Sequence, residues 1–387
     1  MNTKQLDNKY IAHAYGRADL ELCKAQGSFV YDNEGREYID LGSGIAVNIF
    51  GGCDEKWQKA VCDQACSIQH ASNYYYTKPQ SVLAQMLCER TGMKKVFFGN
   101  SGAEANECAI KAARKYSFDK YGEGRSTIIT LRQSFHGRTV TTLTATGQDS
   151  LHNFFMPFTP GFEYVEPGDI KAIDDAIAKG GCCAVMMELI QGEGGVNPLD
   201  KEYAAYVVEA AKANDILVII DEVQSGNGRT GMLYSFMNYG ILPDIFTTAK
   251  GLGGGLPIGV CVFGEKVENV LTPGTHGSTF GGNPVVCAGA VSIFERIDDR
   301  LMDEVAAKGN LIKEMLRGAK NVESVTGMGL MIGIKTTKDA HEIMDKCRER
   351  GVLVLTAKDR VRLLPALNIP AELLTKAVGI VKEVIEE

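Results

Sequence analysis

The stretch ILVIIDEVQSGNGRTG (residues 216–231), followed by PDIFTTAKGLGGG (residues 243–255), decides the fold of this chain. Each stretch contains a short apolar run that passes into a glycine-rich loop, a pattern that predicts a buried strand ending in a turn. The first run ends in an acid, Asp221, and the second ends in a lysine, Lys250, 29 positions later. We therefore expect a carboxylate and an amine to lie at neighbouring strand ends.

Other runs of strand length surround these two. They are STIIT, GFEYV, CCAVMMEL and GVCVFG, and helical patterns at 169–179 and 201–214 fall between several of them. Alternating short strands and helices predict an α/β fold with a mostly parallel central sheet flanked by helices. Ligands bind such sheets at the carboxyl ends of the strands, which is where Glu188, Asp221 and Lys250 fall.

The pattern changes after about residue 290. A long charged helix (299–319), the run VESVTGMGLMIGIK, and a helix at 338–350 predict a smaller α+β C-terminal domain. We therefore divide the chain into three parts. These are an N-terminal segment (1–50), whose hairpin at 29–41 is expected to pack with the small domain, a large domain (51–290) and the small domain (291–387).

Composition excludes several classes of function. The formal net charge of −7 disfavours nonspecific nucleic-acid binding, which needs a basic face. No apolar run reaches the ~18 residues that a membrane span requires. The 11 cysteines and the polar start MNTKQLDNKY favour the reducing cytoplasm over a disulfide framework. The spacing of Cys62/Cys66 and Cys182/Cys183 does not suit a metal site, so no metal is expected.

A lysine and an acid at neighbouring strand ends suit pyridoxal 5'-phosphate (PLP) chemistry. Lys250 would form an imine with this cofactor, and Asp221 would keep the pyridine nitrogen protonated. Val223 would pack on a ring face, and Gln224 would donate a hydrogen bond to the ring oxygen. Alone, either charged residue is an ordinary strand-end side chain, but the combination favours the cofactor.

The cofactor phosphate needs an anion site. Ser101, Gly102 and Ala103 enter a helix, where free N–H groups and the positive end of the helix dipole converge, although simple helix capping is the alternative. Phe135 in SFHGRT (134–139) would stack on the pyridine ring. No GxxxxGK[ST] run is present, so a Walker-type nucleotide site is not supported.

Substrate contacts are expected from three loops. Arg138 would clamp a substrate carboxylate with its planar guanidinium. Glu193, in the loop of QGEGG, would face Arg362 and mask it when the substrate lacks a second carboxylate. Ser278 and Thr279 offer hydroxyls in HGSTFGGNP (276–284). Solvated surface groups and turn formation are the plain alternatives for these residues.

Several motifs together resemble one family. SGAEANE, FHGR, QGEGG, DEVQ-x-G-x-GRTG, PDI-x-T-x-AKGLGGG-x-P-x-G and HGSTFGGNP occur in the order and spacing of the class III PLP-dependent aminotransferases, from about residue 10 to the end. GSGIAVN (42–48) and SNYYYTKPQ (72–80) most resemble members that act on N2-acetylornithine. The resemblance implies a fold-type-I transferase, PLP as cofactor and a homodimer with shared active sites.

The same resemblance implies a role for each matching residue. Lys250 would hold the cofactor and shuttle the proton. The cofactor would contact Gly102, Ala103, Phe135, Asp221, Glu222, Val223 and Gln224, and Thr279 would reach the phosphate of the partner subunit's cofactor. Arg138 and Ser278 would bind acetylornithine, and Arg362 would bind 2-oxoglutarate once Glu193 swings away.

The implied reaction moves the amino group of N2-acetyl-L-ornithine to 2-oxoglutarate in arginine biosynthesis. The alternatives are transamination of ornithine, succinylornithine or 4-aminobutyrate, a PLP-dependent aminomutase that needs no 2-oxoglutarate, and a non-catalytic relative. The chain departs from the family at three places: Gly51-Gly52-Cys53-Asp54-Glu55 replaces a Gly-His-x-His-Pro run, Leu189 replaces proline in Glu-Pro-Ile, and Ser225 follows Gln224. The first departure is expected to alter a loop near the dimer interface.

Overall fold

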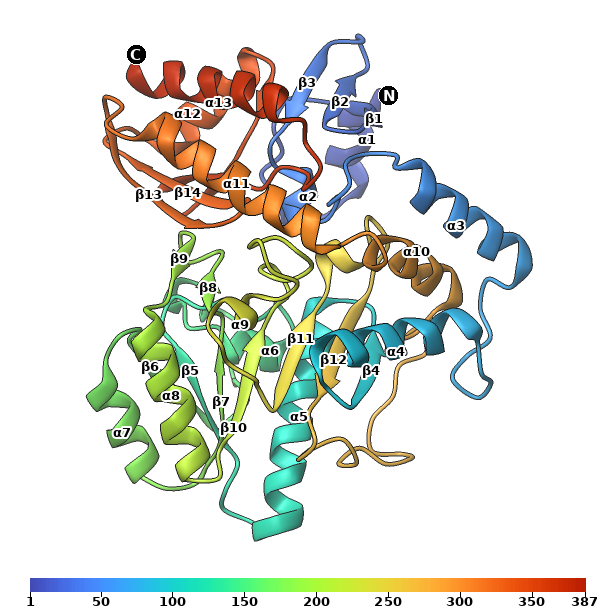
Figure 1. Cartoon of the computed structure of the whole chain (residues 1–387), viewed down its shortest axis with the longest axis vertical. Coiled ribbons are helices and arrows are strands. Elements are labelled where there is room, and N and C mark those ends of the chain that lie inside the picture. The colour runs from blue at the N-terminus through green and yellow to red at the C-terminus, as the bar shows by residue number, and fades with distance from the viewer.

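A seven-stranded sheet forms the centre of the structure (Figure 1), a computed structural model that describes residues 1–387. In spatial order its strands are β4 (Lys95–Gly99), β12 (Gly259–Phe263), β11 (Ile245–Thr248), β10 (Leu217–Asp221), β7 (Cys182–Met187), β5 (Thr127–Leu131) and β6 (Phe162–Val165). The pairs from β11 to β6 are parallel, and only β12 runs antiparallel to its two neighbours. The predicted mostly parallel sheet is therefore confirmed.

Strand β10 shows why these runs are apolar throughout. Alternate residues of a strand face opposite sides of the sheet. Val218 and Ile220 join the core that includes α8 (Lys201–Ala213), whereas Leu217 and Ile219 join the core that includes α5 (Gly102–Tyr121). All five residues of β10 are buried because helices cover both faces, and this explains the continuous apolar run.

The remaining strands form two further four-stranded sheets. One contains β1 (Leu22–Gln26), β2 (Phe29–Asp32), β3 (Glu37–Asp40) and β15 (Val352–Leu353), with β3 and β15 parallel. The other contains β13 (Val322–Met328), β14 (Met331–Thr336), β17 (Arg360–Leu363) and β16 (Leu355–Ala357). The predicted hairpin at 29–41 is thus formed by β2 and β3, and it pairs with a strand from the far end of the chain.

Three helices accompany the C-terminal strands: α11 (Asp299–Leu316), α12 (Ala340–Glu349) and α13 (Ala371–Glu386). Figure 1 shows them with β13 and β14 above the seven-stranded sheet, and β1–β3 beside α13. The other helices are α1 (Thr3–Tyr10), α2 (Ser43–Ala46), α3 (Glu55–Ser67), α4 (Lys78–Thr91), α6 (Val140–Ala145), α7 (Ile170–Ala178), α9 (Ser235–Asn238) and α10 (Pro284–Phe294). Two short strands, β8 (Ile190–Gln191) and β9 (Asn197–Pro198), pair with each other.

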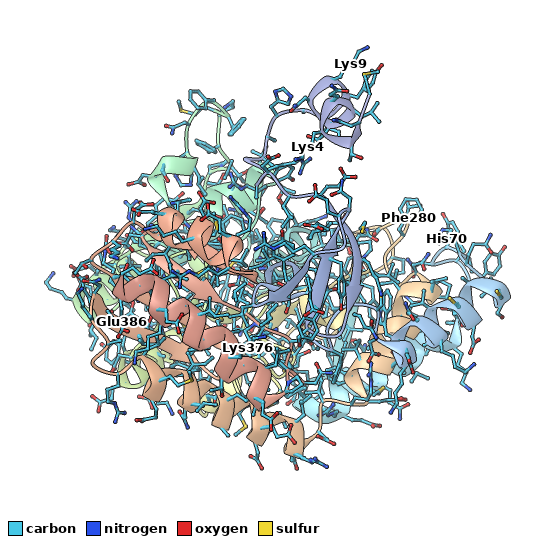
Figure 2. The ribbon with its side chains drawn as sticks, turned by 90° about the horizontal axis from the view of Figure 1, so that it is seen from above. Lys4, Lys9, His70, Phe280, Lys376 and Glu386 are labelled. Atoms are coloured by element: carbon cyan, nitrogen blue, oxygen red, sulfur yellow. The ribbon has the colours of Figure 1, made fainter.

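Two exposed regions stand out in Figure 2. Helix α1, marked by Lys4 and Lys9, projects from the body of the protein, and none of its residues is buried. His70 and Phe280 lie together at another edge, with ring centroids 5.4 Å apart. None of the helices combines the length and apolar character needed to cross a bilayer.

The sheet brings the predicted acid and lysine to one edge. Asp221 is the last residue of β10 and pairs in register with Thr247 of β11, three residues before Lys250. Strand β4 ends nearby at Gly99, and α5 begins directly after it with Ser101 as its N-cap. The carboxyl edge of the sheet therefore presents an amine, a carboxylate and a helix N-terminus.

We predict that Gly259→Ala destabilises this edge. A Cβ at Gly259 would lie 1.9 Å from the carbonyl oxygen of Ser101, so the backbone of β4, β12 or the α5 turn must shift. Such overpacking typically costs about 1–3 kcal/mol, measurable by urea unfolding. The matched control is Gly379→Ala in α13, where no atom lies within 4 Å and the alanine is expected to stabilise the helix by about 0.5–1 kcal/mol. Equal stability of the two variants would contradict the close approach.

Candidate active site

A cavity of about 490 Å³ opens at the carboxyl edge of the seven-stranded sheet. Strand ends, the first turn of α5 and the loops at 135–138 and 255–258 form its wall. The residues predicted from the sequence that line it are Gly102, Ala103, Phe135, Arg138, Glu193, Asp221, Val223, Gln224 and Lys250. Segments that are far apart in the chain thus supply one concave site.

Lys250 is held in an unusual backbone conformation at the wall of this cavity. Its φ of 43° lies in the left-handed region, which costs energy for a residue with a side chain. Burial lowers the pKa of its amine below that of a free lysine, and the Arg362 charge acts in the same direction, while the Glu193, Asp221 and Glu188 carboxylates oppose the effect. A lowered pKa favours the neutral amine, which is the nucleophilic form.

Asp221 is only 4% exposed, and three neighbouring groups contact its carboxylate oxygens at hydrogen-bond distance. Its Oδ2 accepts from Asn106 Nδ2 at 2.8 Å and lies 2.8 Å from His136 Nδ1. Its Oδ1 accepts from the Val223 N–H at 2.9 Å. Asn106 is fixed in turn by Thr247, whose hydroxyl donates to Asn106 Oδ1 at 2.7 Å. The carboxylate is therefore oriented at the cavity wall with its hydrogen-bonding capacity largely satisfied.

Glu188 is a second buried acid at this wall. Its Oε2 accepts from the Phe135 N–H at 2.8 Å and its Oε1 from the Gly192 N–H at 3.2 Å. Burial raises the pKa of this carboxyl to about 7, although the neighbouring His136 acts in the opposite direction. Glu188 thus connects the turn that carries Phe135 with the loop that carries Glu193.

The N-terminus of α5 suits the binding of an anion. The N–H groups of its first turn have no acceptor within the helix. Gly102 packs against Val223, and a Cβ there would lie 2.7 Å from Val223 Cγ1. Only glycine therefore allows this turn to approach the segment that follows Asp221.

The carboxylate-binding candidates occupy two positions. Arg138 is exposed at the cavity, with its guanidinium carbon 5.6 Å from the centroid of the Phe135 ring. Arg362 of β17 is buried and forms an ion pair with Glu193, Nη1 to Oε1, at 2.6 Å. The structure therefore brings together the pair that the sequence predicted over a separation of 169 positions.

Four predicted residues are not among those that line this cavity: Glu222, Ser278, Thr279 and Arg362, which reaches it only through its ion pair with Glu193. Glu222 is a correction to the predicted cofactor contacts, because its carboxylate points away and accepts from Ser225 Oγ, Ser235 Oγ and the Phe236 N–H at 2.6, 2.7 and 2.8 Å. Ser278 and Thr279 line a neighbouring cavity of about 510 Å³. Asn100, which lines both cavities, connects them by donating to Ser278 Oγ at 3.1 Å.

Two residues of the site went unassigned in the sequence analysis. Asn106 lies within the SGAEANE motif and His136 within FHGR, so a motif signal existed for both. Both residues contact Asp221 only in the folded chain, because Asn106 lies 115 positions from Asp221 in the sequence and His136 lies 85 positions from it. No group of three or more His, Cys, Asp or Glu side chains is arranged to hold a metal ion.

The sequence model of the class III aminotransferase family matches residues 10–385. The chain belongs to the class III aminotransferases. Among its relatives, the acetylornithine aminotransferase of Haemophilus ducreyi is 47% identical, covering 99% of this chain and 98% of the relative. That of Methanothermobacter thermautotrophicus is 43% identical, covering 99% of this chain and 98% of the relative.

Solved structures agree with this assignment. The acetylornithine aminotransferase of Elizabethkingia anophelis superposes with a TM-score of 0.89 at 32% identity, covering 99% of this chain and 98% of that one. The ornithine aminotransferase of Toxoplasma gondii, a structure with PLP at partial occupancy in the active site, superposes with a TM-score of 0.94 at 30% identity, covering 99% of this chain and 93% of that one. PLP is the cofactor of this family and of this chain.

The residues present fit that cofactor. A lysine whose pKa is lowered by burial, an oriented carboxylate and a helix N-terminus all reach one cavity. These are the groups that an aldehyde, a pyridine nitrogen and a phosphate require. His136 Nε2 is buried without a partner, so the imidazole makes its ring hydrogen bond through Nδ1 to Asp221 alone.

We predict that Glu188 makes stability depend on pH. Its native pKa of about 7 exceeds the ordinary 4.5, so the native state holds a proton that the unfolded state releases. The stabilisation by the Glu188 carboxyl is fully present at a pH below its ordinary pKa and is lost as the pH rises through its native pKa. The loss in free energy of unfolding amounts to at most about 3 kcal/mol. Urea unfolding from about pH 5 to about pH 8 should show wild type losing stability relative to Glu188→Gln.

The control for this measurement is Glu209→Gln on the exposed face of α8, where the carboxylate stays in water. Its stability curve should run parallel to that of wild type over the whole pH range. A Glu188→Gln curve that is also parallel would contradict the raised pKa.

Proposed function

We propose that this chain transfers the amino group of N2-acetyl-L-ornithine to 2-oxoglutarate, giving N-acetyl-L-glutamate 5-semialdehyde and L-glutamate in arginine biosynthesis. The observation that carries the proposal is the single cavity lined by Lys250, Asp221 and Glu193, in which Glu193 pairs with and masks the buried Arg362. Relatives that cover nearly the whole chain at 38–47% identity are acetylornithine aminotransferases, which supports the choice of donor.

The roles of the cofactor residues follow from their chemistry. Bound PLP supplies an electron sink for the carbanion that forms when the reacting carbon loses its proton. Lys250 Nζ removes and returns that proton, and the lowering of its pKa by burial favours the neutral amine that this role needs. Asp221, fixed by Asn106 and His136, supplies the negative charge that keeps the ring nitrogen protonated. Gly102, Ala103, Phe135 and Val223 position the cofactor.

One site has to accept two different substrates. The donor carries a single free carboxylate, which Arg138 binds with the help of Ser278. Glu193 meanwhile neutralises Arg362, so no bare cation faces the end of the donor that carries the reacting amine and no carboxylate. The acceptor carries a second carboxylate, which replaces Glu193 on Arg362. This exchange preserves the charge balance in both halves of the reaction.

We further propose a homodimer in which Thr279 reaches the phosphate of the partner subunit's cofactor. Large apolar side chains are strongly exposed near Thr279, including Tyr74 at 94%, Tyr76 at 103% and Phe280 at 60%. Asn73 Nδ2 donates to the Gly281 carbonyl at 2.8 Å, so these residues form one surface. Exposed apolar patches of this kind are typical of protein interfaces. We also place the protein in the cytoplasm, which its 11 unpaired cysteines support.

Ornithine is the strongest alternative donor, since ornithine aminotransferases are close structural neighbours with TM-scores up to 0.95. We predict that kcat/KM for N2-acetylornithine exceeds that for ornithine by at least about tenfold, or 1.4 kcal/mol, because free ornithine brings an uncompensated α-ammonium toward Arg138. Glutamate release from 2-oxoglutarate should be compared for acetylornithine, succinylornithine, ornithine and 4-aminobutyrate. A preference for ornithine would overturn the donor assignment, and product without 2-oxoglutarate would indicate an aminomutase.

The shared site predicts complementation between two damaged subunits. Lys250→Ala should abolish turnover and the visible lysine–cofactor band, and Thr279→Ala should weaken turnover strongly. In a mixed dimer, the subunit that retains Lys250 would face the intact Thr279 of the other subunit. Co-expression should therefore restore about a quarter of wild-type activity, from half the dimers with one good site each. Activity no higher than that of Thr279→Ala alone would place Thr279 in its own subunit's site.

A further inference from the structure

The Glu193–Arg362 ion pair has a third member, Gln224. Arg362 Nη1 donates to Glu193 Oε1 at 2.6 Å and Nη2 to Oε2 at 3.3 Å. The Gln224 amide closes the triangle, because its Nε2 donates to Glu193 Oε1 at 3.1 Å and its Oε1 accepts from Arg362 Nη1 at 3.2 Å. Both ends of the amide are therefore engaged by the pair.

The packing around the amide is built for this arrangement. A Cβ on Gly192 would lie 2.4 Å from Gln224 Oε1 and 2.7 Å from its Cδ, so only glycine leaves room for the amide beside the loop. Glu193 stands between Gly192 and Gly194, two residues whose backbones adjust easily. Gln224 is thus held against the base of the loop that carries Glu193.

The three members differ in their freedom to move. The Arg362 side chain is only 4% exposed and Gln224 is 7% exposed, whereas the Glu193 side chain is 30% exposed. Glu193 can therefore turn out to solvent while the other two stay in place. Its departure breaks the ion pair and also the hydrogen bond from Gln224.

The charge state of Glu193 agrees with this arrangement. Burial alone would raise the pKa of its carboxyl, yet the Arg362 charge, the Arg362 hydrogen bonds, the Lys250 charge and the Gln224 hydrogen bond together hold the pKa below its ordinary value. The carboxylate is therefore an anion that these neighbours stabilise in the closed position. A hydrogen bond to a charged group is among the stronger ones in a protein.

We propose that Gln224 is a latch that holds Glu193 on Arg362 and so sets how readily the site accepts a dicarboxylate. This inference rests on the proposed function, because Arg362 must exchange Glu193 for the second carboxylate of the acceptor. A ligand that binds only the open site has its apparent affinity reduced by the fraction of molecules that are open. The latch lowers that fraction, which keeps Arg362 masked while the monocarboxylate donor is bound.

The experiment measures equilibrium binding of glutarate, a five-carbon dicarboxylate without the reactive oxo group. The cofactor-loaded enzyme is titrated by calorimetry in four forms: wild type, Glu193→Ala, Gln224→Met and the double variant. In Glu193→Ala the latch has nothing to hold, so Gln224→Met then reports the loss of the Arg362 contact, of packing and of the expected hydrogen bond to the cofactor ring, all of which are also lost in the wild-type background. The difference between the two backgrounds isolates the latch.

We compare the factor by which Gln224→Met changes the glutarate Kd in the wild-type background with the factor in the Glu193→Ala background. We expect the first factor to favour binding by at least about fivefold relative to the second. The control is Gln148→Met, which removes another buried amide, one that donates to the Ser134 carbonyl and does not line the cavity. This control should leave the glutarate Kd within about twofold of wild type.

The latch would be overturned if Gln224→Met changed the glutarate Kd by the same factor in the two backgrounds. It would also be overturned if Glu193→Ala did not bind glutarate. If wild type still transaminates acetylornithine with 2-oxoglutarate in that case, only the latch has failed. Absence of transamination with every amine donor would instead show that the proposed function has failed.

Discussion

Parallel pairing of β10 with β11 is the constraint on which the site depends. Two parallel neighbours end at the same edge of a sheet, so the residue after one strand meets the residue after the next. The register Asp221↔Thr247 fixes the offset, and Lys250 follows at the next turn. A slip of one residue would turn Asp221 to the opposite face of the sheet, away from Asn106 and His136. Strand register is therefore part of the catalytic geometry.

The site concentrates ionisable groups that would be costly to bury singly. Asp221 is satisfied by Asn106, His136 and a backbone N–H, and Glu193 by Arg362 and Gln224. Each anion is balanced by a cation or by oriented donors, as buried charges require. Glu188 differs from these two acids. It has two backbone donors and no ion pair, and burial raises its pKa in spite of those donors.

The strands and the principal acid and lysine were predictable because both depend on local pattern. Continuous apolar runs such as 217–221 predicted covered strands, and the residues at their ends followed. Glu222 shows the limit of this reasoning, because Asp221 and Glu222 are adjacent in one motif yet point to opposite sides. Only the contacts with Ser235 and Phe236 reveal that Glu222 is the one that faces the core.

The sequence offers no reason for the departure from the family at 51–55. In the structure Asp54 caps α3 and pairs with Arg296 at 2.8 Å, so that segment has its own local support.

Within the seven-stranded sheet only β12 runs antiparallel to its neighbours, and this reversal determines how the backbone of Lys250 is held. Because β12 starts at the edge where β11 ends, the chain returns directly through 251–258, with only a single 3-10 turn (Lys250–Leu252) and no α-helix between the two strands. Both ends of this short connection are fixed in the sheet, and its residues 255–258 form part of the cavity wall. The backbone of the lysine is thus tethered on both sides. Its amine can travel between positions only by rotation about side-chain bonds, so the reach of the proton carrier is set by the length of four methylene groups.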